Sequence, residues 1–569
     1  MLDSTKSVAT AVRIVLVTIV LLASVDRANS QEPINILLVT FDDMNDWVGC
    51  LDGHPQVQTP HLDRLAARGV LFTNAHCASP VCSGSRAANF TGLLPIHNGV
   101  YGNSQKLERT LPNAILLPQD LASQGYHTMG TGKLLHGNSA HMLHEFGVKH
   151  KKFLPITEDE IKILQSEIDA PGPFVQHEIP RLGLTMPLNQ MPRDRDPKSN
   201  RIDSFDWGPI DAPEEEWTDT MSTNWAIAKL RERHDQPFFL GLGIYRPHQP
   251  LWAPKKYHEM YPPDSVELPK VLDDDLNDVG KLARDFGRFP ITSGAHKTVV
   301  ENGQWRNAVS GYLACITFAD AQLGRILDEL DNSPYANNTM IVAWSDHGWQ
   351  LGEKEHWGKF TPWQRSTRVP LIIVPPKSAQ PTGFQPGSRC ERVVSLIDVY
   401  PTIIDMLGLR IREDLDGKSL KPLIAAPKLE WDRVVTSTIG RGTHTVRDQR
   451  WHYTRYFDGS EELYDFQNDP NEWKNLAGNP NLSSIQSRLR NEIPNDSRFQ
   501  QFARYGDFKV VVSAQGNIQV YGPGLEAIKE SKDVSKRHPQ IVAAVEKYLA
   551  THPGADKHIA IPVQQPIEQ

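Results

Sequence analysis

Two short acidic clusters lie at the ends of apolar stretches. Asp42 and Asp43 come directly after the apolar run 34–41, and Asp346 and His347 lie just beyond the run 339–344. Adjacent carboxylates at the end of a buried strand repel each other and lose hydration unless a cation neutralises them. Three carboxylates and one imidazole form a mainly oxygen-donating site, which suits Ca²⁺ or Mg²⁺. The clusters therefore predict a cation site, against the alternative of solvated turn residues that cap helices.

A cysteine stands at the predicted start of a helix, in the segment 79–92. Arg86 follows Cys82 by four residues. A helix N-terminus offers free N–H groups and favours anions, and an arginine one turn further on can pair with the same anionic centre. This pattern predicts an anion-binding reactive site at Cys82. The alternative is a buried cysteine before a helix that carries a surface arginine.

Strands that alternate with helices must position these residues. We expect strands at 34–41, 126–129, 237–245, 339–344 and 370–374, and helices at 61–69, 311–331 and 393–408. Such alternation predicts an α/β fold with a mostly parallel sheet. In open α/β sheets, ligands bind beyond the carboxyl ends of the strands. Lys133 and His248 also follow predicted strands, so we expect them to share one edge with the two acidic clusters.

A smaller unit is expected after a boundary near residue 430. Segments 434–437, 443–447 and 451–457 have the pattern of short antiparallel strands. We therefore divide the chain into a catalytic domain, 31–430, and a C-terminal α+β subdomain with its tail, 431–569. No motif is evident beyond residue 485. The polar segments 145–215 and 255–305 are expected to be insertions around the site rather than core.

The first thirty residues are typical of a secretory signal peptide. Lys6 and Arg13 precede an apolar run over 14–23, which is too short to span a bilayer. Small residues at 28–30 predict cleavage at the 30/31 bond. We therefore expect a secreted or periplasmic protein that is not held in a membrane after cleavage. The alternative is a buried N-terminal helix or strand.

The composition excludes several classes of protein. The chain has 569 residues, with 60 basic and 68 acidic side chains and a formal net charge of −8, which argues against a nucleic-acid-binding protein. A mean hydropathy of −0.43 excludes a polytopic membrane protein. Five cysteines are an odd number, so at least one is unpaired within an exported chain.

The segment that begins at Cys82 resembles the signature of the sulfatase family, with Arg86 and the pair Thr91-Gly92 at the matching positions. Other segments resemble family motifs in the same order along the chain: 59–65, 91–99, 132–136, 247–250, 345–348 and 463–476. The resemblance implies an alkaline-phosphatase-like fold, in which helices sandwich a large, mostly parallel sheet and a C-terminal subdomain is built on an antiparallel sheet. The segments 346–353 and 357–359 are most similar to the iduronate-2-sulfatase branch.

The resemblance also implies a cofactor, a modification and two partners. Asp42, Asp43, Asp346 and His347 are expected to bind Ca²⁺, with Mg²⁺ as the alternative, and Cys82 is expected to face the metal. A formylglycine-generating enzyme would oxidise Cys82 to formylglycine, whose hydrated aldehyde is the nucleophile. The substrate would be a sulfated sugar or polysaccharide, such as a glycosaminoglycan.

Further roles are carried over residue by residue. Arg86, Lys133 and His136 are expected to hold the hydrated aldehyde, and Asp346 is expected to act as the base. His248 and Lys359 would contact the sulfate, and one of them would protonate the leaving alcohol. The alternatives are a surface lysine at 359 and a structural histidine at 248.

One position departs from the family signature. The third residue of the signature is usually proline or alanine, whereas this chain has Gly84. Because glycine lacks the φ restraint of proline, the modifying enzyme could recognise the segment less well. Two alternatives to a sulfatase therefore stay open: a phosphodiesterase or phosphonate monoester hydrolase of the same superfamily, and a non-catalytic binder of sulfated glycans.

Overall fold

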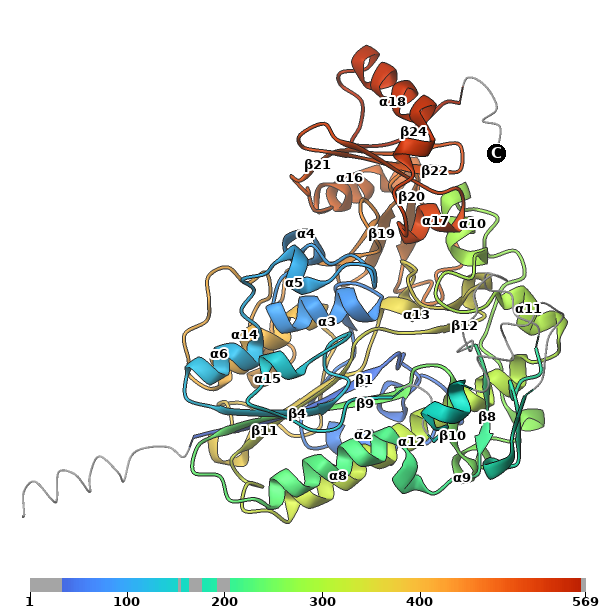
Figure 1. Cartoon of the computed structure of the whole chain (residues 1–569). Helices are drawn as coiled ribbons and strands as arrows, with labels where there is room; N and C mark the ends of the chain where they lie inside the picture. The colour runs from blue at the N-terminus through green and yellow to red at the C-terminus, as the bar shows by residue number, and fades with distance from the viewer. Residues whose placement is uncertain (1–32, 152–154, 163–176, 192–204, 564–569) are drawn as a thin grey trace, which may run out of the picture.

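The computed structural model describes residues 33–151, 155–162, 177–191 and 205–563 (Figure 1). The expected signal peptide lies outside these residues. Within the described ranges, no helix is both long and apolar enough to cross a membrane.

An eight-stranded sheet forms the centre of the larger part of the molecule (Figure 1). Its strands run in the order β15 (Ser388–Cys390), β2 (Val70–Phe72), β14 (Leu371–Val374), β11 (Thr339–Ser345), β1 (Asn35–Asp42), β9 (Phe238–Pro247), β4 (His127–Gly132) and β5 (Glu145–Phe146). Strand β1 is paired in parallel with both β9 and β11. Strand β14 is antiparallel to its two neighbours, and the other pairs are parallel. The predicted α/β fold with a mostly parallel sheet is therefore confirmed.

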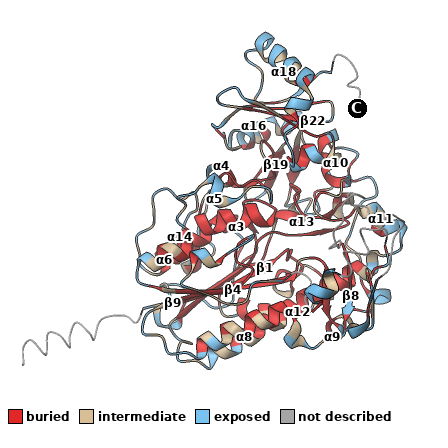
Figure 2. Cartoon of the chain, viewed as in Figure 1, coloured by how far each residue is buried: buried red, intermediate tan, exposed pale blue. Residues whose placement is uncertain are grey.

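Helices cover both faces of this sheet. Side chains of β1 alternate between two cores, with Leu37 and Val39 in one and Ile36 and Leu38 in the other. The first core includes α8 (Thr218–Arg231) and α12 (Trp305–Asp331), and the second includes α3 (Cys82–Thr91), α6 (Leu117–Ser123) and α14 (Val399–Met406). Figure 2 shows the buried sheet between these two helical layers. Because β1 is apolar on both faces, its carboxyl end lies deep inside the protein.

Two smaller sheets make up the C-terminal part. The predicted antiparallel sheet contains β17 (Val435–Thr438), β18 (His444–Arg447), β19 (Trp451–Arg455) and β20 (Glu461–Asp465). A second sheet, which the sequence analysis did not identify, contains β23 (Ile518–Tyr521), β22 (Phe508–Ser513), β21 (Phe499–Tyr505) and β24 (His558–Ile561). Helix α18 (Pro539–Thr551) packs Ile541 and Val545 against this second sheet.

All three predicted helices have different bounds. The helix predicted over 61–69 is α2 (Pro60–Ala66), which ends three residues earlier. Helix α12 begins at Trp305 rather than 311, because Ala308 and Val309 are also fully buried in the core. The segment predicted as one helix over 393–408 begins instead with a short strand, β16 (Val394–Ser395), and a 3-10 turn. The carboxylate of Asp398 accepts the backbone N–H of Ser395 at 2.8 Å, so α14 begins only after that turn.

The prediction that 145–215 and 255–305 are insertions rather than core is wrong for part of each segment. In the first segment, Phe205, Trp207 and Ile210 are buried in the core that includes α8 and α12. Helix α10 (Lys281–Arg288) and the turn before it bury Leu276, Leu282 and Phe286. These side chains belong to a core between the two parts of the molecule, together with Val81, Phe360, Trp363, Ile439, Tyr456, Tyr464 and Phe502. The sequence analysis missed this core because its apolar residues are separated by polar ones. Two of its members, Val81 and Phe360, directly adjoin Cys82 and Lys359.

Candidate active site

The carboxyl ends of four parallel strands lie together at one edge of the central sheet. Strand β1 ends in Asp42, and β4, β9 and β11 end just before Lys133, His248 and Asp346. Nζ of Lys133 donates a hydrogen bond to Asp42. The structure thus brings together side chains that are widely separated in sequence, at the edge where the strand pattern placed them.

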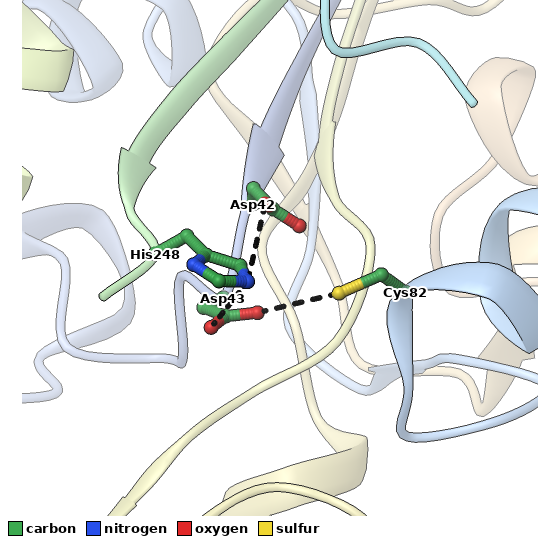
Figure 3. Close-up of side chains that lie close together, drawn as sticks. All are labelled: Asp42, Asp43, Cys82 and His248. Atoms are coloured by element: carbon green, nitrogen blue, oxygen red, sulfur yellow. Dashed lines mark hydrogen bonds and ion pairs between the residues drawn. The ribbon is translucent and has the colours of Figure 1, made fainter. Parts of the chain in front are cut away.

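The acidic clusters form a compact group of potential metal ligands. The donor atoms of Asp42, Cys82, Asp346 and His347 all lie within 4.8 Å of one another, and the same holds for Asp42, Asp43, Cys82 and His248. Figure 3 shows the second set, with the His248 ring pointing toward both aspartates and Asp43 pointing toward Cys82. All of these side chains except His248 are fully buried.

The donor set fits a hard divalent cation. Oδ2 of Asp43 is buried and has no hydrogen-bond partner within the described part of the chain. A bound cation would offset the cost of burying this oxygen. Nδ1 of His347 lies 3.0 Å from the Gly348 carbonyl oxygen. If Nδ1 carries the proton and donates it to this carbonyl oxygen, the lone pair of Nε2 is left to bind a cation that the carboxylates also bind. Burial lowers the pKa of His347, which favours the neutral imidazole that a metal ligand requires.

The two adjacent aspartates differ in their electrostatics. Burial by itself would raise the pKa of Asp42, but Lys133, His248 and Arg86 hold that pKa well below its ordinary value. Burial, with the neighbouring Cys82 and Asp42, raises the pKa of Asp43 to about 8, although Lys359 opposes the shift. Two ionised carboxylates side by side in a buried site are therefore costly, and a divalent cation would remove that cost.

Cys82 is the first residue of α3 and is buried against the same group. Its Sγ lies 2.9 Å from Nζ of Lys359, 3.3 Å from Nε2 of His347 and 3.8 Å from Oδ1 of Asp43. Burial and the charge of Asp42 raise the pKa of the thiol, which favours the protonated form. A neutral thiol is a poor nucleophile, whereas hydroxyl oxygens at this position would face both the cation site and two basic side chains. All five cysteines of the chain are free of disulfides.

Arg86 has a different environment from the one expected. The guanidinium is fully buried and donates to Asp346 at 2.8 Å, to Asp42 at 3.4 Å and to the carbonyl oxygens of Phe41, Lys133 and Leu134. These contacts tie the ends of β1, β4 and β11 together. Arg86 therefore orients the carboxylates, and its contact with a hydrated aldehyde stays a prediction.

His248 is oriented by its neighbours. Its Nδ1 lies 2.8 Å from the hydroxyl oxygen of Tyr245 and 2.6 Å from the Gln249 carbonyl oxygen, so that Nε2 points to Asp42 and Asp43 at 3.9 and 3.8 Å. Tyr245 also stacks on His150, with ring centroids 5.4 Å apart. The sequence analysis did not single out Tyr245 or His150. Tyr245 ends a predicted strand three residues before His248, and this spacing could have predicted that its side chain lies at the same edge of the sheet.

The remaining expected site residues are Lys359 and His136. Lys359 is buried, and its Nζ lies 2.5 Å from Oδ1 of Asp43, so it is not a surface lysine. The carboxylates and Cys82 raise the pKa of Lys359 against the effect of burial, which favours the ammonium form.

His136 is exposed, three residues beyond Lys133. The structure records no contact between His136 and Cys82, and its role stays a prediction.

Gly84 lies in a crowded part of α3. A Cβ atom at this position would lie 2.6 Å from Oγ and 2.9 Å from Cβ of Ser79. Real Cβ atoms do not approach other atoms so closely, so proline or alanine would require Ser79 to move. Gly84→Pro alone is therefore expected to disturb the packing of α3 against Ser79.

Comparison with protein families identifies the larger part of the chain. The model described as Sulfatase matches residues 34–409. The chain belongs to the sulfatase family. A second model, described as N-sulphoglucosamine sulphohydrolase, C-terminal, matches residues 352–498. Together with the relatives below, this membership makes the protein a sulfuric ester hydrolase.

Similar proteins support this sulfatase assignment over most of the chain. A sulfatase of Formosa agariphila is 35% identical over 470 residues, covering 81% of this chain and 86% of the relative. Iduronate 2-sulfatase of Homo sapiens is 28% identical over 431 residues, covering 69% and 72%.

Solved structures show the same fold. A phosphonate monoester hydrolase from Silicibacter pomeroyi has a TM-score of 0.63 at 23% identity, covering 81% of this chain and 94% of that chain. A 2-O GAG sulfatase has a TM-score of 0.59 at 22% identity, covering 81% and 91%.

Proposed function

We propose that this sulfatase is an exported enzyme that removes sulfate from a sulfated sugar, with formylglycine at position 82 as nucleophile. The observation that carries the proposal is the position of Cys82 at the start of α3, 2.9 Å from Lys359 and 3.3 Å from His347. A protonated thiol is a poor nucleophile at this position. The two hydroxyl groups of a hydrated aldehyde would interact with the basic side chains and with a bound cation. Export rests on the signal-peptide pattern of residues 1–30.

The cation would be held by Asp42, Asp43, Asp346 and His347. Ca²⁺ is the ion we propose, because the two overlapping groups of potential ligands each contain two carboxylates, which together are Asp42, Asp43 and Asp346, and Ca²⁺ prefers oxygen ligands. A divalent cation here would polarise the sulfate oxygens and offset the negative charge of the transition state. Arg86 holds Asp42 and Asp346 in place, and Nδ1 of His347 is fixed by the Gly348 carbonyl.

The proposed reaction has two displacement steps at this site. One hydroxyl of residue 82 loses its proton to Asp346, and its oxygen attacks sulfur as the bond from sulfur to the sugar oxygen breaks. His248 or Lys359 gives a proton to the departing alcohol. The second hydroxyl then gives its proton to His248 or Lys359, whichever had protonated the alcohol, the carbon–oxygen bond to the sulfate breaks, and sulfate leaves as the aldehyde re-forms. Water hydrates the aldehyde again.

The substrate is proposed by similarity. The relatives include an iduronate 2-sulfatase, and one structural neighbour is described as a 2-O GAG sulfatase. We propose a uronate-containing sulfated glycan, with the sulfate on a ring hydroxyl. Lys133 and Lys359 give the site the positive charge that such an anion needs.

A second activity is favoured by one comparison. The fold is shared with phosphonate monoester hydrolases, and a cationic pocket built for sulfate also suits a singly charged phosphate diester or phosphonate monoester. Such a reaction would be a side activity of the same site.

The test compares matched small substrates. Purified enzyme from a host with a formylglycine-generating system is assayed with an aryl sulfate, an aryl phosphate diester and an aryl phosphonate monoester that share one leaving group. We expect the highest kcat/KM for the sulfate. A higher kcat/KM for either phosphorus substrate would contradict the proposal, because hydrolysis of phosphorus esters would then be the main activity and sulfate hydrolysis the side activity. Sulfate release from 2-O-sulfated and 6-O-sulfated oligosaccharides then tests the proposed sugar position.

A further inference from the structure

A single residue of the C-terminal part contacts both ends of the segment that carries Lys359. Glu472 lies in the turn after β20, and its backbone carbonyl oxygen accepts a hydrogen bond from Nζ of Lys354. Its carboxylate oxygen Oε2 accepts the backbone N–H of Gln364 at 2.8 Å. Lys354 and Gln364 lie five residues on either side of Lys359. Glu472 therefore closes the segment 354–364 into a loop.

Both ends of this segment are fixed by further contacts. Nζ of Lys354 also donates to Asp275 at 2.5 Å and lies 5.1 Å from the centre of the Tyr464 ring. Arg447 donates to the side chain of Gln364 at 2.8 Å and to Oε1 of Glu472 at 3.0 Å.

The middle of the segment is held against the signature helix. The backbone N–H of Phe360 donates to the Pro80 carbonyl oxygen at 2.9 Å, two residues before Cys82. Phe360 packs in one core with Val81 and with Ile439 of the C-terminal part. The position of Lys359 relative to Cys82 is therefore set by these contacts together with the two anchored ends of the segment.

Glu472 is held firmly enough to serve as a fixed point. It is 2% exposed, and its backbone has a left-handed φ of 58°. Lys354 is also 2% exposed and has a φ of 55°. Non-glycine residues keep such backbone angles only where surrounding contacts impose them, commonly near functional sites. Burial opposes ionisation of Glu472, but His452 and Arg447 lower its pKa to about 2, so the carboxylate is charged at neutral pH.

We propose that Glu472 is a positioning residue for Lys359, through which the C-terminal part of the chain sets the geometry of the nucleophile. It reaches neither Cys82 nor the metal ligands through any contact that the structure records. The inference rests on the proposed catalytic role of Lys359. Misplacement of a reacting group by about 1 Å can cost about a hundredfold in rate.

A double-mutant cycle tests this proposal with an aryl sulfate as substrate. Glu472→Gln removes the charge of the carboxylate. The cycle compares four proteins: wild type, Glu472→Gln, Lys359→Ala and the double variant. We expect kcat to fall by about tenfold to a hundredfold in the normal chain, with little change in KM, and by less than about twofold in the Lys359→Ala chain. Aldehyde content at residue 82 is measured in each protein, and kcat is expressed per aldehyde.

Two further variants keep the test decisive. Glu461→Gln removes a carboxylate whose partners, Arg490 and Tyr453, lie within the C-terminal part, and we expect less than about twofold change in kcat. Gln364→Ala, at a half-buried position, removes the side-chain contact with Arg447, which also binds Glu472, and keeps the backbone N–H that bonds to Glu472. It tests the anchoring of this end of the segment if Glu472→Gln does not fold. We expect it to lower kcat in the normal chain but not in the Lys359→Ala chain.

The outcomes separate this inference from the proposed function. If Lys359→Ala lowers kcat and the Glu472 or Gln364 variant costs the same factor in both chains, the positioning role is overturned while the role of Lys359 stands. If Lys359→Ala leaves kcat unchanged, both the proposed role of Lys359 and the inference built on it are wrong.

Discussion

Nζ of Lys359 lies 2.9 Å from Sγ of Cys82, although 277 residues separate them in sequence. The contact joins the first residue of the signature helix to a segment held by the C-terminal part of the chain. It places a buried ammonium group next to the proposed nucleophile. The predictions below follow from this contact and its surroundings.

Replacing Cys82 by serine tests the identity of the nucleophile. A serine hydroxyl can attack sulfur, but it has no second hydroxyl to expel sulfate. We expect turnover to fall by about 10³-fold or more, with the sulfated serine accumulating. Steady-state kinetics and intact-protein mass spectrometry measure both effects. Cys390→Ser, at another buried cysteine, is the control, and full activity of Cys82→Ser would contradict the mechanism.

Replacing Asp346 by alanine tests the cation site. Loss of this carboxylate removes one oxygen donor and the closer of the two carboxylates that pair with Arg86, so bound metal and turnover should both fall sharply. Elemental analysis of the purified protein measures the metal. Asp320→Asn is the matched control, because this buried carboxylate accepts the N–H groups of His61 and Leu62 away from the site. Unchanged metal content in Asp346→Ala would argue against the proposed ligands.

The crowding at Gly84 gives a paired prediction. Gly84→Pro alone should lower the thermal stability of the folded enzyme, because the new Cβ meets Ser79 at 2.6 Å. Oγ of Ser79 has no hydrogen-bond partner among the described residues, so its removal costs no such bond. Ser79→Gly combined with Gly84→Pro should therefore regain stability, and its aldehyde fraction should equal or exceed that of wild type. Equal melting temperatures for Gly84→Pro and wild type would contradict the packing argument.

The buried carboxylate of Glu472 predicts a loss of stability in acid. Its pKa is about 2 in the folded chain, compared with an ordinary value of 4.5. A lowered folded-state pKa adds stability that is present above about pH 4.5 and is lost as the pH falls toward 2. The shift corresponds to about 3 kcal/mol. Denaturant unfolding of wild type and Glu472→Gln should show a stability gap that narrows between pH 5 and pH 3. A gap that stays constant over that range would contradict the assignment.

Much of the active site could be predicted because buried strands that end in charged residues are visible in sequence. Asp42 and Asp346 each follow an apolar run, and parallel strands bring their carboxyl ends together. Glu472 and Tyr464 could not be found in this way, since their importance depends on which segment packs against them. Beyond residue 485 the resemblance to known motifs ended, and the short strands β21 to β24 were missed. Similarly, Leu276, Leu282 and Phe286 were missed because they pack in a core whose other members include residues of the C-terminal part.

Peptide mass spectrometry across Cys82 tests the central claim most directly. The protein is produced with graded amounts of a formylglycine-generating enzyme, and turnover of an aryl sulfate is plotted against the fraction of residue 82 that carries the aldehyde. We predict a straight line through the origin, with no turnover in fully unconverted protein. Full turnover in protein whose residue 82 is entirely cysteine would contradict the account.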